Sequence, residues 1–301
     1  MQPAESRDWV AEVFPTAELA RLTRLLPLGS WRRRAAKSVA ARALDAALDA
    51  RQAVLRSGRA LDRAAEIPER ELLVFGVYAP DGVADMAAAV SEIGASRHRT
   101  RFALGALGAA APKLAQQTIA VEMRGGKFAN LNWLAGEGGG AESADWVLIV
   151  DDDVVLPERF ADRLISVAEL LDFDLAQPAQ TWSSDAAWRV TRRRPAMARR
   201  TRFVETGPVT LMSSEVFAAV YPFDEQGMGW GLDLHWAALA KRHGWSLGIV
   251  DALVMRHERR GTATTYGEAD ALEAARRFLE THEHLGFDEA QEVLARYRSI
   301  R

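Results

Sequence analysis

The 301-residue chain contains no cysteine at all. This absence excludes disulfide bonds, thiolate metal sites and cysteine nucleophiles, and it agrees with a reducing cytoplasm as the expected location. An excess of positive charge is also missing, because the formal net charge is -3. Nucleic-acid binding depends on clustered positive charge, so we expect no nucleic-acid partner.

Long apolar runs are missing as well. None reaches the ~18 residues that a membrane-spanning helix needs. Residues 1–20 carry four acids and lack the charged-then-apolar order of a secretion signal. We therefore expect a cytoplasmic protein, either freely soluble or peripheral at the inner face of the membrane.

The first 67 residues have the composition of a helical extension. Residues 31–66 contain no proline and a single glycine, Gly58. Leucines recur at helical spacing, which predicts one long helix or two helices that break near Ser57–Gly58. Ile67–Pro68 ends this segment. We divide the chain into a helical extension, 1–67, and one α/β domain, 68–301.

The remaining sequence alternates short apolar segments with helical periodicity. This alternation predicts an α/β fold whose mostly parallel sheet is flanked by helices. Residues 146–150 are apolar throughout, as in a central strand covered on both faces. The other expected strands are 72–78, 99–107, 118–123, 175–180, 187–193, 207–213 and 247–255. The expected helices are 83–93, one that opens at 128–134, 158–171, 214–220, 233–243 and 267–284.

Three consecutive acids, Asp151, Asp152 and Asp153, follow the predicted central strand directly. Ligands of open α/β sheets bind at such carboxyl ends of strands. Alternation along the strand points Asp151 and Asp153 the same way, and two carboxylates ~6 Å apart repel by roughly 3 kcal/mol at an effective dielectric of about 20. A divalent cation would relieve this repulsion, and oxygen ligands favour Mg²⁺ or Mn²⁺. The alternative is a solvated acidic loop in which Asp152 or Asp153 caps a turn before Pro157.

These acids and two further motifs resemble GT-A glycosyltransferases, especially the broad inverting family that includes many bacterial sugar transferases. The Asp-x-Asp element corresponds to residues 151–153, followed by Pro157. The Gly-Lys-x-x-x-x-Asn element corresponds to 126–132, and the acid at a helix start corresponds to 229–233, Gly-Trp-Gly-Leu-Asp. The chain has Leu-Asp where that family more often has an acid pair.

A closer resemblance is to an uncharacterised GT-A-like family marked by three stretches in a fixed order. They are Gln177-Pro178-Ala179, the segment 201–205 leading to Pro208, and the Gly-Trp-Gly-Leu-Asp motif at 229–233. The resemblance covers residues 71–286 and leaves the helical extension outside. It implies a metal-dependent transfer of a sugar from a nucleoside diphosphate sugar to a saccharide, lipid or other hydroxyl acceptor, with inversion.

The resemblance also implies roles for an imidazole and a late acid. His257, after an apolar strand, would join Asp151 and Asp153 as the third metal ligand; by itself it is a surface histidine beside two charged residues. Asp233 would be the general base that takes the proton of the acceptor hydroxyl. The competing interpretation makes Asp233 the N-cap of the helix that follows it.

Donor binding is expected from Tyr78, Lys127 and Trp230, together with Asp151 and Asp152. Tyr78 would contact the donor base, Lys127 would neutralise the leaving diphosphate, and Trp230 would stack on the sugar from a loop between two glycines. The alternatives are a packed strand-end tyrosine and a solvated lysine.

Glu205 would hydrogen-bond the acceptor or form a structural salt bridge with Arg202 or Arg194.

The basic segment 21–42 has seven basic residues and no acid. It would contact anionic lipid or, alternatively, pack on the catalytic domain or pair between subunits of a homo-oligomer. Two rival functions also stay open. One is a non-catalytic sugar- or lipid-binding relative of the fold. The other is a sugar-nucleotide nucleotidyltransferase, which is disfavoured because residues 78–82 lack the Gly-rich basic loop it would need.

Overall fold

The computed structural model of the chain describes residues 30–138, 143–184, 186, 188–229, 231–257 and 268–300. The extension forms two helices, α3 (Ser30–Val54) and α4 (Ser57–Ala64). The chain turns between them at Arg56, whose φ of 52° lies in the left-handed region. The prediction of a helical segment that breaks close to Ser57 is confirmed.

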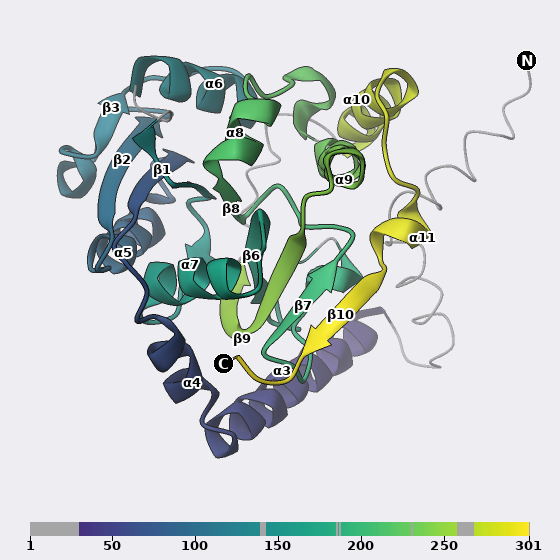
Figure 1. Cartoon of the computed structure of the whole chain (residues 1–301). Helices are drawn as coiled ribbons and strands as arrows, with labels where there is room; N and C mark the ends of the chain where they lie inside the picture. Colours follow the sequence, from purple (N-terminus) through teal and green to yellow (C-terminus); the bar gives the residue numbers. More distant parts are fainter. Residues whose placement is uncertain are drawn as a thin grey trace, which may run out of the picture.

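The core is one sheet of ten strands within the described residues, with helices on both sides (Figure 1). Its order is β10-β7-β9-β6-β8-β4-β1-β2-β3, and β5 pairs with β9. The strands are β1 (Glu71–Tyr78), β2 (Arg99–Ala106), β3 (Thr118–Ala120), β4 (Trp146–Val150), β5 (Val154–Val155), β6 (Leu175–Gln180), β7 (Ala198–Thr201), β8 (Val209–Ser213), β9 (Leu247–His257) and β10 (Val293–Tyr297).

The sheet is mixed, so the expectation of a mostly parallel sheet is correct for one half. Strand β1 pairs in parallel with β2 and β4, β2 with β3, and β6 with β9. Strand β8 runs antiparallel to both β4 and β6, and β7 and β10 add further antiparallel pairs. An antiparallel neighbour such as β8 needs no crossover helix between it and the strand beside it.

Helices cover both faces of the sheet. One face packs against α4, α5 (Val83–Gly94) and α7 (Phe160–Leu170). The other packs against α6 (Lys127–Gly138), α8 (Ser214–Val220), α9 (Leu232–His243) and α10 (Glu268–Thr281). Strand β4 supplies Trp146, Leu148 and Val150 to the first core and Val147 and Ile149 to the second. Its predicted central position is confirmed.

The sequence pattern gave the wrong strands in two places, because tryptophan and arginine side chains rather than aliphatic ones are buried there. The expected strand 187–193 is instead a short 3₁₀ turn at Arg189–Thr191, where Trp188 packs on Phe203 with ring centroids 4.4 Å apart. Strand β7 was missed because it contains two arginines. One of them, Arg199, is buried in an ion pair with Asp251 at 2.7 Å.

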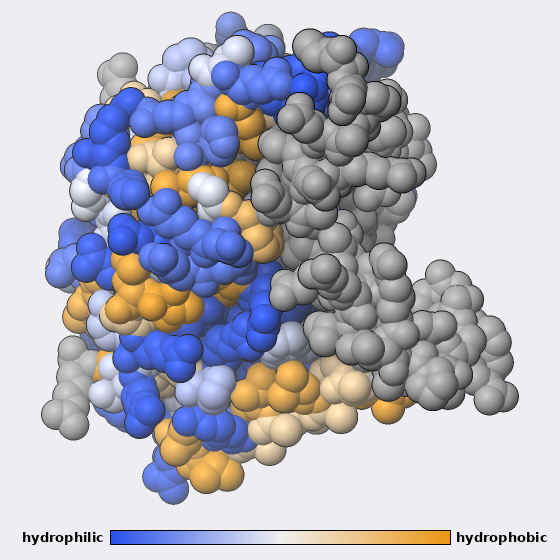
Figure 2. Space-filling view, turned by 90° about the vertical axis from the view of Figure 1, so that its right-hand side faces the viewer, coloured by the Kyte–Doolittle hydropathy of each residue, from blue (hydrophilic) through white to orange (hydrophobic). Residues whose placement is uncertain are grey.

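No helix in the described part of the chain is long and apolar enough to cross a bilayer. On the face shown in Figure 2, the coloured surface is largely hydrophilic and its apolar residues form separate patches. Of the basic segment 21–42, the residues before Ser30 lie outside the described residues.

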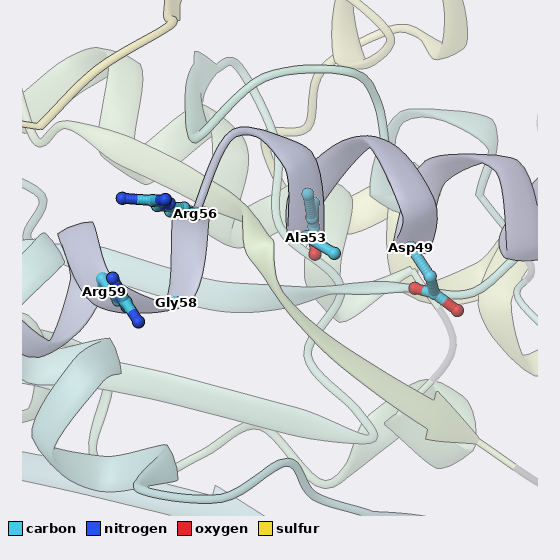
Figure 3. A pocket seen from close by; sticks show the side chains of 6 residues that line it. Asp49, Ala53, Arg56, Gly58 and Arg59 are labelled. Atoms are coloured by element: carbon cyan, nitrogen blue, oxygen red, sulfur yellow. The ribbon is translucent and has the colours of Figure 1, made fainter.

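An open hollow lies along α3 and α4, lined by Asp49, Arg56 and Arg59 (Figure 3). These residues belong to the extension, not to the acidic strand end at 151–153.

Candidate active site

The acidic strand end lies beside the first turn of α6. The backbone N–H of Asp151 donates to the carbonyl of Pro208 at 2.8 Å, which fixes the chain as it leaves β4. The carboxylate of Asp151 lies 2.5 Å from Lys127 Nζ. A Cβ atom at Gly207 would lie 3.0 Å from Lys127 Nζ and 3.2 Å from Asp151 Oδ2. Glycine at this position therefore leaves room for the ion pair, which joins two of the three GT-A-like motifs.

Asp153 and His257 come together through a short antiparallel pairing. Val154 in β5 pairs with His257 at the end of β9. Asp153 is 8% exposed, and its Oδ1 lies 3.2 Å from His257 Nε2. Burial lowers the pKa of His257, but the hydrogen bond to Asp153 and the charges of Asp153 and Asp151 outweigh it, so the net pKa is raised.

The candidate metal ligands fit a divalent cation in part. Two adjacent ligands of a six-coordinate metal at about 2.1–2.2 Å lie about 3 Å from each other, close to the separation of Asp153 Oδ1 and His257 Nε2. A ring nitrogen with a carboxylate suits Mn²⁺ better than Mg²⁺. The third expected ligand, Asp151, is instead paired with Lys127. Across the described ranges no three His, Asp or Glu residues stand at metal-binding separation.

Asp152 turns away from its two neighbours, as alternation predicts. Its Oδ2 accepts a hydrogen bond from the backbone N–H of Ala79 at 2.7 Å, and a Cβ atom at Gly82 would lie 1.8 Å from the same oxygen. Burial is the main reason that the pKa of Asp152 rises to about 6. Asp152 thus ties the end of β4 to the turn after β1.

Tyr78 takes the packed alternative that the sequence left open. It is 1% exposed, and its hydroxyl contacts Thr118 Oγ1 at 2.8 Å and the backbone N–H of Ala111 at 3.1 Å. This burial and these two contacts agree with the packed alternative, and a contact with the donor base stays a prediction.

Asp233 lies in the first turn of α9. The helix begins at Leu232 with Gly231 as its N-cap, at a φ of 87°, so the N-cap interpretation of Asp233 is wrong by two positions. Asp233 Oδ1 accepts from the backbone N–H of Leu234 at 2.9 Å. Burial raises the pKa of Asp233 to about 7 against the opposing hydrogen bonds, one of them from the side chain of Trp188. Trp230, immediately before this helix start, lies outside the described residues.

Glu205 interacts electrostatically with both Asp233 and His257. Burial is the first cause that raises its pKa to about 8, and the charge of Asp233 raises it further while His257 opposes the shift. Glu205 therefore lies within electrostatic reach of both residues. Its Oε2 accepts from Gln180 Nε2 at 2.5 Å, and its backbone N–H donates to Gln177 Oε1 at 2.5 Å.

The salt-bridge alternatives for Glu205 do not form. Arg202 pairs with Glu292 at 3.4 Å, and Arg194 lies over the ring of Trp182.

Two of the sequence stretches, 177–179 and 201–205, are joined here by a hydrogen bond. Gln177 from the first stretch holds Glu205 from the second, and Glu205 is within electrostatic reach of Asp233 from the third. Sequence reasoning missed Gln180, which follows the first stretch at the end of β6 and binds Glu205. Its position at a strand end was the available signal.

Comparisons with known proteins agree with this architecture. The structure is similar to GalNAc-T7 solved with UDP, GalNAc and Mn²⁺, with a TM-score of 0.50 and 13% identity over 70% of this chain and 48% of that one. It is also similar to the mannosyltransferase PcManGT from Pyrobaculum calidifontis in complex with GDP-Man and Mn²⁺, with a TM-score of 0.50 and 15% identity over 83% and 77% of the two chains.

No family model matches the sequence, and no curated protein does. The chain spans about half of the GalNAc-T7 structure that it resembles. At these identities the likeness concerns the fold: the chain has the α/β fold of GT-A glycosyltransferases, with a mixed sheet and an N-terminal helical extension.

Proposed function

We propose that this protein is a metal-dependent glycosyltransferase that moves a sugar from a nucleoside diphosphate sugar to an acceptor hydroxyl. The observation that carries the proposal is the pairing of Asp153 with His257, beside the Asp151–Lys127 ion pair at the carboxyl end of the central strand. Two structures with this fold were solved with Mn²⁺ and a nucleotide or nucleotide sugar. The position of these residues at a strand end agrees with the general rule for ligand sites in α/β sheets.

In this proposal Asp153 and His257 would hold Mn²⁺ or Mg²⁺, with Asp151 as a third ligand once its carboxylate is shared with the ion. When bound, the ion would supply Lewis-acid stabilisation of the diphosphate leaving group. Lys127 supports the same charge with its ammonium group, which Asp151 holds at 2.5 Å. Asp152 supports the donor side indirectly, because it fixes the turn after β1. The family resemblance gives Trp230 a role in stacking on the sugar, and this role stays part of the proposal although Trp230 lies outside the described residues.

Asp233 acts as the general base of an inverting transfer. Its carboxylate accepts the proton of the acceptor hydroxyl while that oxygen forms a bond to the anomeric carbon. The bond from this carbon to the diphosphate oxygen breaks, and the electron pair leaves with the nucleoside diphosphate. A pKa of about 7 suits this task, since a base is most effective near the working pH. Glu205, with its pKa of about 8, stays largely protonated and is available as a hydrogen-bond donor to a hydroxyl.

A thermal-shift screen of nucleoside diphosphates with and without Mn²⁺ tests the proposal. We expect a shift of several degrees for one nucleotide that requires Mn²⁺, and slow hydrolysis of the matching donor. Replacing both Asp151 and Asp153 by Asn should abolish the metal requirement and the turnover.

Asp62→Asn is the matched control, because Asp62 forms ion pairs with Arg159 and Arg163 on α7, away from this site. If the double variant kept both the metal requirement and turnover, the enzyme assignment would be wrong. Metal-dependent binding without any donor hydrolysis would instead favour the non-catalytic relative.

A further inference from the structure

The helical extension, which the family resemblance leaves outside, is joined to the candidate site by a buried carboxylate. Asp45 of α3 is 7% exposed. Its Oδ1 accepts from the backbone N–H of Trp182 at 2.8 Å. Its Oδ2 accepts from the backbone N–H of Ser183 at 2.9 Å and from Ser183 Oγ at 2.8 Å. Three donors from a turn 137 residues further along the chain thus converge on one side chain.

This turn, residues 181–184, also holds the histidine of the candidate metal site. The backbone N–H of His257 donates to Ser184 Oγ at 3.0 Å. Ser184 is fixed in turn by Thr181, whose Oγ1 lies 2.7 Å from Ser184 Oγ and accepts from the Ser184 backbone N–H at 3.1 Å. The turn is therefore bound by Asp45 of α3 on one side and bonded to the backbone of His257, the residue that faces Asp153, on the other.

Two other contacts of α3 differ in whether they lead to the site. Asp49 pairs with Arg193 at 2.6 Å, and Gln52 Nε2 donates to the carbonyl of Asp251 at 2.8 Å. Asp49 lies one helical turn from Asp45 and projects from α3 beside the open hollow (Figure 3). The carbonyl of Arg193 accepts from Trp182 Nε1 at 3.1 Å, so the Asp49 contact leads back to the turn 181–184. The contact of Gln52 ends at Asp251 in β9 and does not touch this turn, so Gln52 separates a purely structural role of α3 from a role in the site.

We propose that Asp45 is a positioning residue for His257, and that helix α3 is therefore an integral part of the metal site. The proposal rests on the proposed function, in which His257 is a metal ligand. Hydrogen-bonded partners behind metal ligands fix the orientation of those ligands, and losing one typically costs 10–100-fold in metal affinity. Here the partner reaches the histidine through its backbone N–H and the hydroxyl of Ser184.

The experiment uses the full chain and four variants: Asp45→Asn, Ser184→Ala, their combination, and Gln52→Ala as the matched control. Free Mn²⁺ is measured by electron paramagnetic resonance to obtain its affinity without a donor. The imidazole ¹⁵N signals of His257, assigned with His257→Gln, are recorded without metal. Unfolding temperatures of all variants report the loss of stability.

We expect Asp45→Asn and Ser184→Ala each to weaken Mn²⁺ binding about tenfold and to shift the His257 signals, with the combined variant no worse than about tenfold. Gln52→Ala should lower the unfolding temperature but leave the Mn²⁺ affinity within about twofold of the parent chain and the His257 signals unshifted. Ser184→Ala removes only one hydroxyl, from a buried residue, and keeps the test valid if Asp45→Asn does not fold.

Two results overturn different claims. Unchanged His257 signals and Mn²⁺ affinity in Asp45→Asn and Ser184→Ala would refute the positioning role while the metal site itself stands. A parent chain that binds no Mn²⁺, with His257 signals that still move in both variants, would refute the metal assignment of the proposed function and leave only the structural coupling.

Discussion

The buried carboxylate of Asp233 should make the protein less stable as the pH rises. Burial raises its pKa in the folded chain from 3.8 to about 7. The native state therefore binds this proton more tightly than the unfolded state does, so stability is greatest below the unfolded pKa and is lost as pH rises towards the folded pKa. With these values, Asp233 alone lowers the free energy of unfolding by about 2.5 kcal/mol between about pH 5 and about pH 8.

Asp233→Asn removes this dependence because the amide has no proton to lose. The variant should be more stable than the parent chain at about pH 8, by up to roughly 4 kcal/mol, and should approach it at acidic pH. Most of the dependence that Glu205 contributes remains in both proteins, since its own pKa of about 8 arises first from burial. The nearby charge of His257 is likewise present in both.

The assay is urea unfolding of both proteins at several pH values from about 5 to about 8, with Asp62→Asn as the control for loss of a surface charge. A difference of about 2.5 kcal/mol corresponds to roughly 4 °C in the unfolding temperature of a chain of this size. Parallel stability curves for the parent and Asp233→Asn would refute the reasoning, because they would mean that Asp233 is ionised in the folded chain at no cost. The same variant should lose about 10²–10⁴-fold in turnover if Asp233 is the base.

Two further predictions concern neighbours of this helix start. Glu205→Gln should keep turnover within about tenfold at neutral pH, because a neutral amide replaces a carboxyl that is largely protonated there. Asp233→Asn should lose more turnover than this, and equal losses of the two variants in steady-state assays would contradict the division of roles. Gly229→Ala should lower the free energy of unfolding by about 2–4 kcal/mol, since its φ is +84° and the new Cβ would lie 2.6 Å from Phe128. The control Gly244→Ala, at a φ of +79° with open space around it, should lower the free energy of unfolding by only about 1 kcal/mol. Equal values for the two variants in a denaturant titration would disprove the clash with Phe128.

Local patterns were sufficient for much of the architecture. The apolar run at β4 predicted a central strand because a strand covered on both faces must be apolar on both. The alternation of Asp151, Asp152 and Asp153 predicted that Asp152 faces elsewhere, and it does bind Ala79. The antiparallel half of the sheet could not be predicted in the same way, since β7 is held by the buried ion pair of Arg199 rather than by an aliphatic pattern.

By itself, the sequence determined the α/β class, the acidic end of the central strand and the helical extension, because each depends on residues close together in the chain. Only the tertiary structure decided which acids meet which partners. His257 reaches Asp153 through pairing of two distant strands, and Glu205 acquires its raised pKa from burial near Asp233. Asp45 caps a turn 137 residues away. Distances and dielectric environment between remote segments are properties of the packed chain, and no local pattern encodes them.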